Sequence, residues 1–144
     1  MYENNQQIIS LEKSNINVKR LKSIINLIFQ NENISPDSRL SIIITNNKNL
    51  QELNKEYKNL NNPTDVLSFQ FDKDGFPNTI SILGDVYISL DKAKEQSKYY
   101  DVSLQNEVER LMIHGILHLI GYTHNKKKKA KEMEEKTKYY INTA

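Results

Sequence analysis

The chain has 144 residues, a length that fits one domain with its own core. It contains 20 Lys and Arg, 18 Asp and Glu and no Cys. The absence of Cys excludes disulfides and thiolate metal sites, and the near balance of charges excludes a strong overall electrostatic field that would attract a polyanion. No apolar run reaches the roughly 18 residues that span a bilayer, and the first ten residues lack a signal-peptide pattern. We therefore expect one cytoplasmic domain over residues 1–144 with no membrane partner.

Hydrophobic periodicity and turn residues predict about four strands and five helices. The predicted order is a strand at 7–11, a helix at 18–29, a strand at 40–44, a helix at about 50–57, strands at 66–71 and 82–88, and helices at about 90–99, 104–120 and 127–141. Turn residues fill 73–77, Ser89 is a predicted N-cap, and Gly121 is expected to end its helix. Because strands and helices do not alternate regularly, we predict an α+β fold with a small mixed sheet.

All three histidines of the chain fall within eleven residues, at His114, His118 and His124. On a helix, the first two leave the same face one turn apart, and a left-handed Gly121 would let the third fold back toward them. Three neutral imidazoles with a position left for water are typical of a catalytic zinc site, whereas single histidines on helices are more often ordinary core or surface residues. The pattern predicts one bound Zn²⁺ or another divalent cation.

The spacing H-x-x-x-H-x-x-G-x-x-H is that of the metzincin proteases except at one position. Where those enzymes have a catalytic Glu, this chain has Gly115, which cannot take a proton from a bound water. Peptide hydrolysis by that mechanism is therefore disfavoured. A metal ion at the same place would still polarise a phosphoryl oxygen.

Three blocks of the chain follow, in order, the signature of a known family. Residues 53–57 and 63–69 read LNKEY and PTDVLSF, residues 83–89 read LGDVYIS, and residues 114–124 read HGILHLIGYTH. They resemble the L-N-x-x-Y-R…P-T-D-V-L-S-F, L-G-D-I-x-I-S and H-G-x-L-H-L-x-G-Y-D-H blocks of the YbeY family of bacterial rRNA maturation factors. The resemblance implies an α+β fold in which the three histidines hold one ion, usually zinc. It also implies a metal-dependent, single-strand-selective endoribonuclease that acts near the 3′ end of small-subunit 16S rRNA and in ribosome quality control.

Two positions depart from the family pattern. Thr123 stands where the family usually has Asp, so a hydroxyl replaces a carboxylate that would orient a ligand or tune the metal. Lys58 stands where the family has Arg, which keeps a positive charge for a phosphate but loses the bidentate fork. We predict that Lys58 contacts the RNA phosphate and belongs to the catalytic residues with His114.

Asp85 is the third predicted catalytic residue. It follows Gly84 in an otherwise apolar strand and is a candidate base or partner of a ligand histidine, with satisfaction of backbone groups as the alternative. The sequence contains no obvious dedicated general base.

A lysine run and several aromatic residues are further candidates for RNA contacts. The predicted RNA-binding lysines are Lys126, Lys127, Lys128 and Lys129, which follow the third histidine. A solvated helix start is the competing interpretation of that run. Residues that can stack on unpaired bases, or simply pack, are Tyr57, Phe76, Tyr99, Tyr100 and Tyr122.

The predicted partners are single-stranded RNA, rRNA and the small ribosomal subunit, and no part of the sequence predicts an oligomeric state. One alternative is a non-enzymatic ribosome-associated factor with a structural metal. Another is a metallopeptidase-like hydrolase whose base lies outside the histidine motif. A folded His114→Ala variant that loses RNA cleavage favours the nuclease, whereas one that only keeps ribosome association favours the factor. Cleavage of a peptide library would favour the peptidase.

Overall fold

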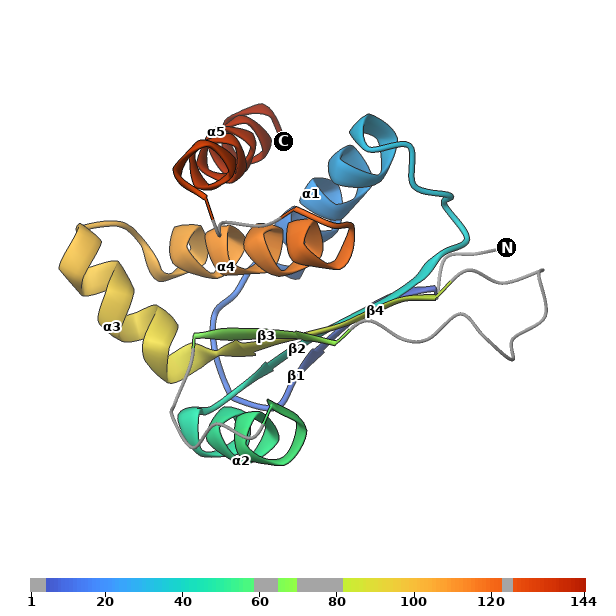
Figure 1. Cartoon of the computed structure of the whole chain (residues 1–144). Helices are drawn as coiled ribbons and strands as arrows, with labels where there is room; N and C mark the ends of the chain where they lie inside the picture. The colour runs from blue at the N-terminus through green and yellow to red at the C-terminus, as the bar shows by residue number, and fades with distance from the viewer. Residues whose placement is uncertain (1–4, 59–64, 70–81, 123–125) are drawn as a thin grey trace.

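The computed structural model describes residues 5–58, 65–69, 82–122 and 126–144, which are coloured in Figure 1. The strands in these ranges are β1 (Gln6–Ser10), β2 (Arg39–Thr45), β3 (Val66–Phe69) and β4 (Ile82–Ser89). The helices are α1 (Val18–Asn31), α2 (Asn47–Lys58), α3 (Leu90–Tyr100), α4 (Leu104–Leu119) and α5 (Lys127–Thr143). None of these helices is both long and apolar enough to span a membrane.

The described strands form one sheet in the order β1-β2-β4-β3. Strands β1, β2 and β4 run parallel, and β3 pairs with β4 in the antiparallel direction. The parallel pairs need crossover connections, and α1 and α2 lie in those connections. The predicted α+β fold with a small mixed sheet is therefore confirmed.

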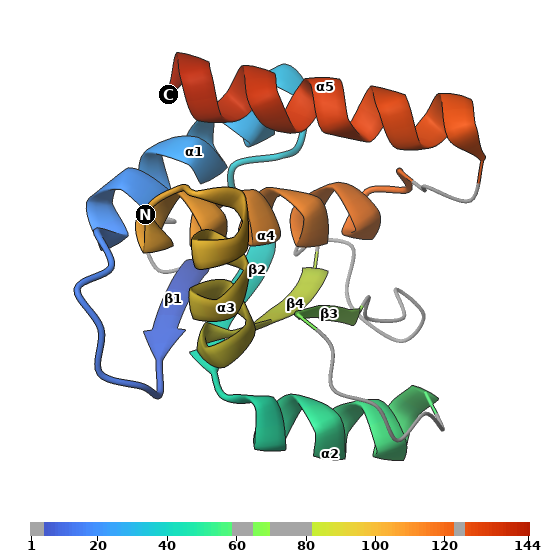
Figure 2. The same cartoon turned by 90° about the vertical axis from the view of Figure 1, so that its left-hand side faces the viewer.

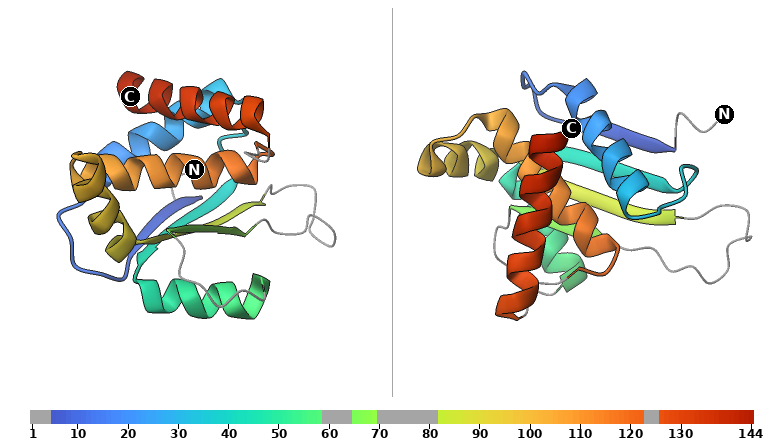
Figure 3. Two further views of the ribbon diagram at one scale, coloured as in Figure 1. Left: turned by 60° about the vertical axis from the view of Figure 1, so that its left-hand side comes forward. Right: turned by 90° about the horizontal axis from the view of Figure 1, so that it is seen from above.

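Helices cover the two faces of the sheet unequally. Figures 1 and 2 show α4, α1 and α5 on one side of the sheet and α2 alone on the other. Helix α4 lies directly on the sheet, and both α1 and α5 pack against α4 and against each other (Figure 3). The core lies between β2, β4 and these three helices. Its fully buried residues include Leu21, Ile24, Ile28, Ile42, Ile44, Val86, Ile88, Val108, Met112, Ile113, Ile116 and Leu117.

The helix boundaries follow capping side chains. Ser89 caps α3 as predicted, since its hydroxyl accepts from the amide of Lys92 at 3.1 Å. Helix α2 begins earlier than predicted because the Asn46 side chain accepts from the amide of Asn49 at 2.9 Å. Gly121 follows α4 with φ of 105°, the left-handed conformation expected of a helix-ending glycine. The predicted strand at 66–71 ends at Phe69 within the described residues, and the predicted turn at 73–77 lies outside them.

Gly115 lets α4 lie directly on the sheet. A Cβ atom at this position would lie 2.4 Å from Cγ1 of Val86 on β4, far inside van der Waals contact. The hydroxyl of Ser68 on β3 donates to the Gly115 carbonyl at 3.0 Å, which fixes the same contact. The glycine that replaces the metzincin Glu therefore has a packing role in this fold.

We expect Gly115→Ala to lower the free energy of unfolding by about 1–3 kcal/mol, because overpacking outweighs the ~1 kcal/mol helix preference of Ala. Urea unfolding measures the change. Adding Val86→Ala makes room for the new methyl group, so the double variant should lose less stability than the sum of the single variants. Strictly additive losses would contradict the proposed contact.

Candidate metal centre

A stripe of three partly exposed residues runs along an otherwise buried part of α4. Between residues 107 and 119, only Arg110, His114 and His118 are partly exposed, and every other residue is buried. Their spacing of four residues places them on one face of the helix. The structure thus puts His114 and His118 on a helix with a shared face, the arrangement that the sequence predicted for two metal ligands.

The imidazole of His114 has an unsatisfied nitrogen. Its Nε2 atom is buried and has no hydrogen-bond partner within the described part of the chain. The Oε2 atom of Glu134 on α5 lies 3.9 Å away, which is too far for a hydrogen bond. Burial lowers the pKa of His114, and the positive charge of Arg110 lowers it further. The imidazole is therefore neutral near pH 7, the form that binds a metal ion.

The third predicted ligand, His124, and the neighbouring Thr123 lie outside the described residues. Within the described ranges, no three His, Asp or Glu side chains converge to hold an ion. A three-ligand site with His114 and His118 therefore needs a donor from elsewhere in the chain, and the role of His124 stays a prediction. The unsatisfied Nε2 of His114 and the imidazole nitrogens of the predicted donor set fit a zinc ion.

Arg110 is a neighbour of the site that the sequence analysis did not single out. Its Nε and Nη2 atoms donate to the two carboxylate oxygens of buried Glu107 at 3.0 and 2.6 Å. Its Nη2 atom also contacts Gln96 at 3.5 Å, and Gln96 in turn donates to Asp65 at 3.2 Å. The hydrogen bonds with Glu107 raise the pKa of Arg110, so a permanent positive charge is fixed one turn from His114. The four-residue spacing of Arg110, His114 and His118 was the available signal.

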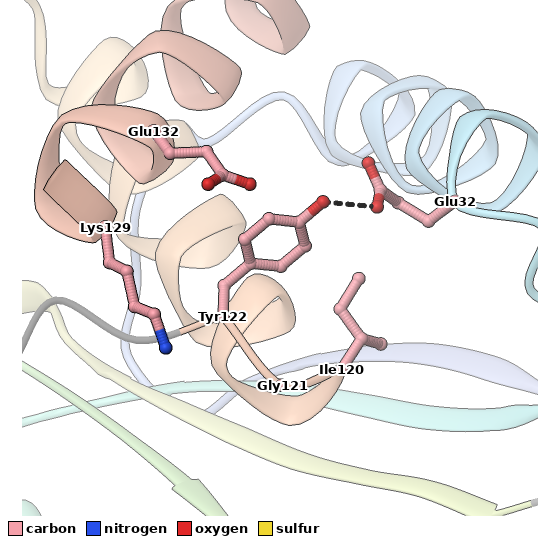
Figure 4. A pocket seen from close by; sticks show the side chains of 6 residues that line it. All are labelled: Glu32, Ile120, Gly121, Tyr122, Lys129 and Glu132. Atoms are coloured by element: carbon pink, nitrogen blue, oxygen red, sulfur yellow. Dashed lines mark hydrogen bonds between the residues drawn. The ribbon is translucent and has the colours of Figure 1, made fainter.

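Tyr122, directly after α4, is held by the carboxylate of Glu32 at the end of α1. The Tyr122 hydroxyl donates to Glu32 Oε1 at 2.8 Å (Figure 4), and Lys136 Nζ donates to Oε2 at 2.8 Å. The hydroxyl of Tyr140 donates to the same Oε2 atom. These four side chains, which we call the Glu32 cluster, join α1, α5 and the segment after α4.

The Glu32 cluster keeps its carboxylate ionised. Burial raises the pKa of Glu32, but the hydrogen bonds from Lys136, Tyr140 and Tyr122 outweigh burial and hold the pKa below its ordinary value. The same hydrogen bond with Glu32 raises the pKa of Lys136, so this pair is charged at neutral pH. The ammonium of Lys136 also lies 5.2 Å from the centre of the Tyr122 ring, a favourable cation–π distance.

Asp85 lies on the opposite face of the sheet from α4. Gly84 and Val86 face α4, because Cβ atoms there contact or would contact that helix, and side chains alternate along a strand. Asp85 therefore faces the side that α2 covers, next to Ser41 of β2 in the strand register. Burial raises the pKa of the Asp85 carboxyl, and the Ser41 hydrogen bond offsets only part of this rise. Its catalytic role stays a prediction.

Lys58 is the last residue of α2, and its side chain lies outside the described part of the structure. The four lysines at 126–129 are all exposed around the start of α5. This helix has no acidic residue in its first turn and no side-chain cap, so its positive end carries four further positive charges. Such an arrangement lowers the stability of the start of the helix and favours the binding of an anion beside it.

A pocket of about 430 Å³ lies between the end of α4 and the first turns of α5. The described residues that line it are Glu32, Ile120, Gly121, Tyr122, Lys129 and Glu132, as Figure 4 shows. The pocket is thus lined both by residues 120–122 of the histidine motif and by Lys129 of the lysine run.

The three sequence blocks and this arrangement are explained by one family. The family model described as Endoribonuclease YbeY matches residues 1–144. The chain belongs to the YbeY family. Its relatives include Endoribonuclease YbeY of Bacillus licheniformis, which is 40% identical over 118 residues, or 77% of this chain and 75% of that protein. The protein of the same name from Alkaliphilus metalliredigens is 38% identical over 137 residues, covering 93% of this chain and 87% of the relative.

A solved structure has the same fold. The solution structure of a Thermotoga maritima protein superposes with a TM-score of 0.66 and 28% sequence identity. The alignment covers 94% of this chain and 86% of that protein. The two proteins therefore share one fold.

Glu32→Gln removes the negative charge that three donors share, so we expect a loss of about 1–3 kcal/mol in the free energy of unfolding at pH 7. The folded pKa of Glu32 lies below its usual 4.5, so this contribution is complete above that value and disappears as the pH falls through the folded pKa. Urea unfolding at several pH values should show the two proteins converging in acid. Glu135→Gln is the exposed control, because the Glu135 side chain is solvent-exposed and its carboxylate lies 4.0 Å from the ammonium of Lys131. A stability gap that does not shrink with acid would contradict the assignment.

Proposed function

We propose that this YbeY-family chain is a metal-dependent endoribonuclease that cleaves single-stranded RNA. Its proposed biological substrate is rRNA, near the 3′ end of the small-subunit 16S species, with a role in ribosome quality control. The observation that carries the proposal is the half-exposed stripe of α4, where His114 and His118 share a face and the buried Nε2 of His114 has no partner in the described residues. The name shared by the relatives, Endoribonuclease YbeY, supports the same reaction class.

In this proposal His114, His118 and His124 hold one Zn²⁺. A divalent cation there supplies Lewis-acid chemistry at a phosphodiester. The protein contributes two imidazoles on a helix that the core fixes in place, because nearly every other residue of that part of α4 is buried. Burial, together with the positive charge of Arg110, lowers the pKa of His114, and Arg110 is itself held by Glu107.

Positive charges at the end of α2 and at the start of α5 would orient the RNA backbone. Lys58 ends α2, and residues 126–129 begin α5. Lysine ammonium groups bind phosphates as point charges and raise the local concentration of a polyanion. Because the α5 lysines repel the positive end of their own helix, a bound phosphate relieves an unfavourable interaction in the free protein.

A peptidase role is less well supported than RNA cleavage. The position of the metzincin base is Gly115, and a Cβ atom there would lie 2.4 Å from Cγ1 of Val86. The close packing of α4 on β4 leaves no room for a Glu. Among the described acidic residues, Glu134 and Asp65 act electrostatically on His114, and both come from other parts of the chain than α4.

His118→Ala should abolish both metal binding and RNA cleavage. We expect about one zinc per chain in the wild type by elemental analysis, and a zinc affinity reduced by more than about 100-fold in the variant, since even residues behind the ligands contribute about 10- to 100-fold. Cleavage of a labelled single-stranded RNA should fall to background.

The control for this experiment is the wild-type protein, stripped with a chelator and reloaded, because every histidine of the chain belongs to the motif. Zinc should restore cleavage in the reloaded wild type and not in folded His118→Ala. Zinc that is equally retained in both proteins contradicts the histidine site. Zinc without RNA cleavage in the wild type favours a ribosome-associated factor with a structural metal.

Replacing the four lysines at 126–129 with Gln should weaken RNA binding most strongly at low salt. Each lost phosphate contact reduces the slope of log affinity against log salt by about 0.7 for single strands. The folded protein should be equally stable or more stable, since the substitution removes repulsion at the start of α5. Fluorescence anisotropy over a salt series and thermal unfolding measure the two effects. An unchanged slope of log affinity against log salt would show that these lysines do not contact the RNA and are only a solvated start of the helix.

A further inference from the structure

The described residues that line the pocket between α4 and α5 include none of the histidines. It contains about 430 Å³, within the range of about 300–1,000 Å³ typical of small-molecule pockets. Its wall includes the ring of Tyr122, which lies in the middle of the view in Figure 4, two residues before His124 in the sequence. An aromatic ring in the wall of a pocket beside a proposed RNA-cleaving site calls for a specific explanation.

The Tyr122 ring is held in one orientation before any ligand arrives. Its hydroxyl donates to Glu32 at 2.8 Å, and the Lys136 ammonium lies 5.2 Å from the ring centre. The side chain is nevertheless partly exposed and lines the pocket. A pre-oriented ring loses little side-chain entropy when a ligand stacks on it, so it is suited to binding a planar group.

One face of α5 supplies the polar groups of the pocket. Lys129, Glu132 and Lys136 are spaced by three and four residues and so share that face. Lys136 binds Glu32, whereas Glu132 is exposed and lines the pocket together with Lys129. The carboxylate of Glu32 already accepts three hydrogen bonds. Glu132 is thus the acidic lining residue whose oxygens face a ligand.

We propose that this pocket binds one unpaired nucleobase of the RNA strand, stacked on Tyr122, with the base edge donating to Glu132. The inference rests on the proposed function and deepens it, because it adds a base-recognition subsite beside the metal centre. Two carboxylates in the wall disfavour a free phosphate as the occupant, whereas the exposed lysines at 126–128 are placed for the flanking backbone.

The chemistry of Glu132 also sets a base preference. A carboxylate is only an acceptor, so it binds best to an edge with two adjacent donors. The N1–H and amino group of guanine provide such an edge. Uracil offers a single N–H between two carbonyl oxygens that repel the carboxylate. The pocket should therefore prefer guanine over uracil.

The test measures binding of non-cleavable 2′-O-methyl RNA octamers to the zinc-loaded full chain by fluorescence anisotropy. One octamer is all uridine, and the other has a single central guanosine. Tyr122→Leu should weaken binding of the guanosine octamer by roughly 5- to 100-fold, because it removes a stacking ring. Tyr122→Phe keeps the ring but loses the hydrogen bond that orients it, so it should weaken binding less than Tyr122→Leu does.

Glu132→Gln should bring the affinities for the two octamers close to each other. Because Glu132 is exposed, this variant tests the pocket even if Tyr122→Leu does not fold. Glu135→Gln removes the same charge from a neighbouring exposed position of α5 and is the matched control, expected to keep the guanosine preference. Zinc content should be unchanged in all four variants.

Several results would overturn the proposal. The first is equal weakening of RNA binding by Tyr122→Phe and Tyr122→Leu, which would point to the hydroxyl rather than the ring. The second is loss of zinc in Tyr122→Leu. The third is RNA binding that neither Tyr122→Leu nor Glu132→Gln changes. Failure of the proposed function would give a different result. The variants would change octamer binding as predicted, but the wild type would cleave no single-stranded RNA. A wild type that cleaves RNA while binding is insensitive to both pocket variants removes only the base subsite.

Discussion

The close approach of α4 to β4 is the constraint on which the rest of the site depends. Gly115 makes this approach possible, because a Cβ atom there would meet Val86 at 2.4 Å. With the helix seated on the sheet and α1, α3 and α5 packed around it, residues 107–119 are buried except for one stripe. The two histidines of α4 occur on that stripe. The packing that stabilises the domain therefore also decides which way the histidines face.

The outer helices are joined by charged and polar groups rather than by apolar contacts alone. Glu32 collects donors from Tyr122, Lys136 and Tyr140 where α1 ends. Charge-assisted hydrogen bonds in a partly buried place are stronger than exposed ion pairs, so this cluster is suited to fixing the segment after α4. On the other side of α4, buried Glu107 fixes Arg110. Along the chain, the two histidines of α4 thus lie between Arg110 and Tyr122, and hydrogen bonds hold both of these neighbours in place.

Membership of the YbeY family gives these features a functional context. The family model covers the whole chain, and relatives named Endoribonuclease YbeY share 38–40% of aligned residues with it. The exposed lysines at the start of α5, the pocket beside them and the histidine stripe lie on or next to two helices that are adjacent in space. A strand of RNA could contact all three at once, with its backbone at the lysines and one base in the pocket.

The sequence by itself determined the local features, because local patterns depend on neighbours along the chain. Periodicity and caps predicted the helices, the mixed sheet and the same-face placement of His114 and His118. Tertiary structure decided what depends on residues distant in sequence. It placed Asp85 on the α2 face, since strand alternation relative to a packed helix cannot be assigned from the strand alone. It also brought Glu32 to Tyr122 across 90 positions and Glu134 toward His114, contacts that arise only when three helices pack on one side of the sheet.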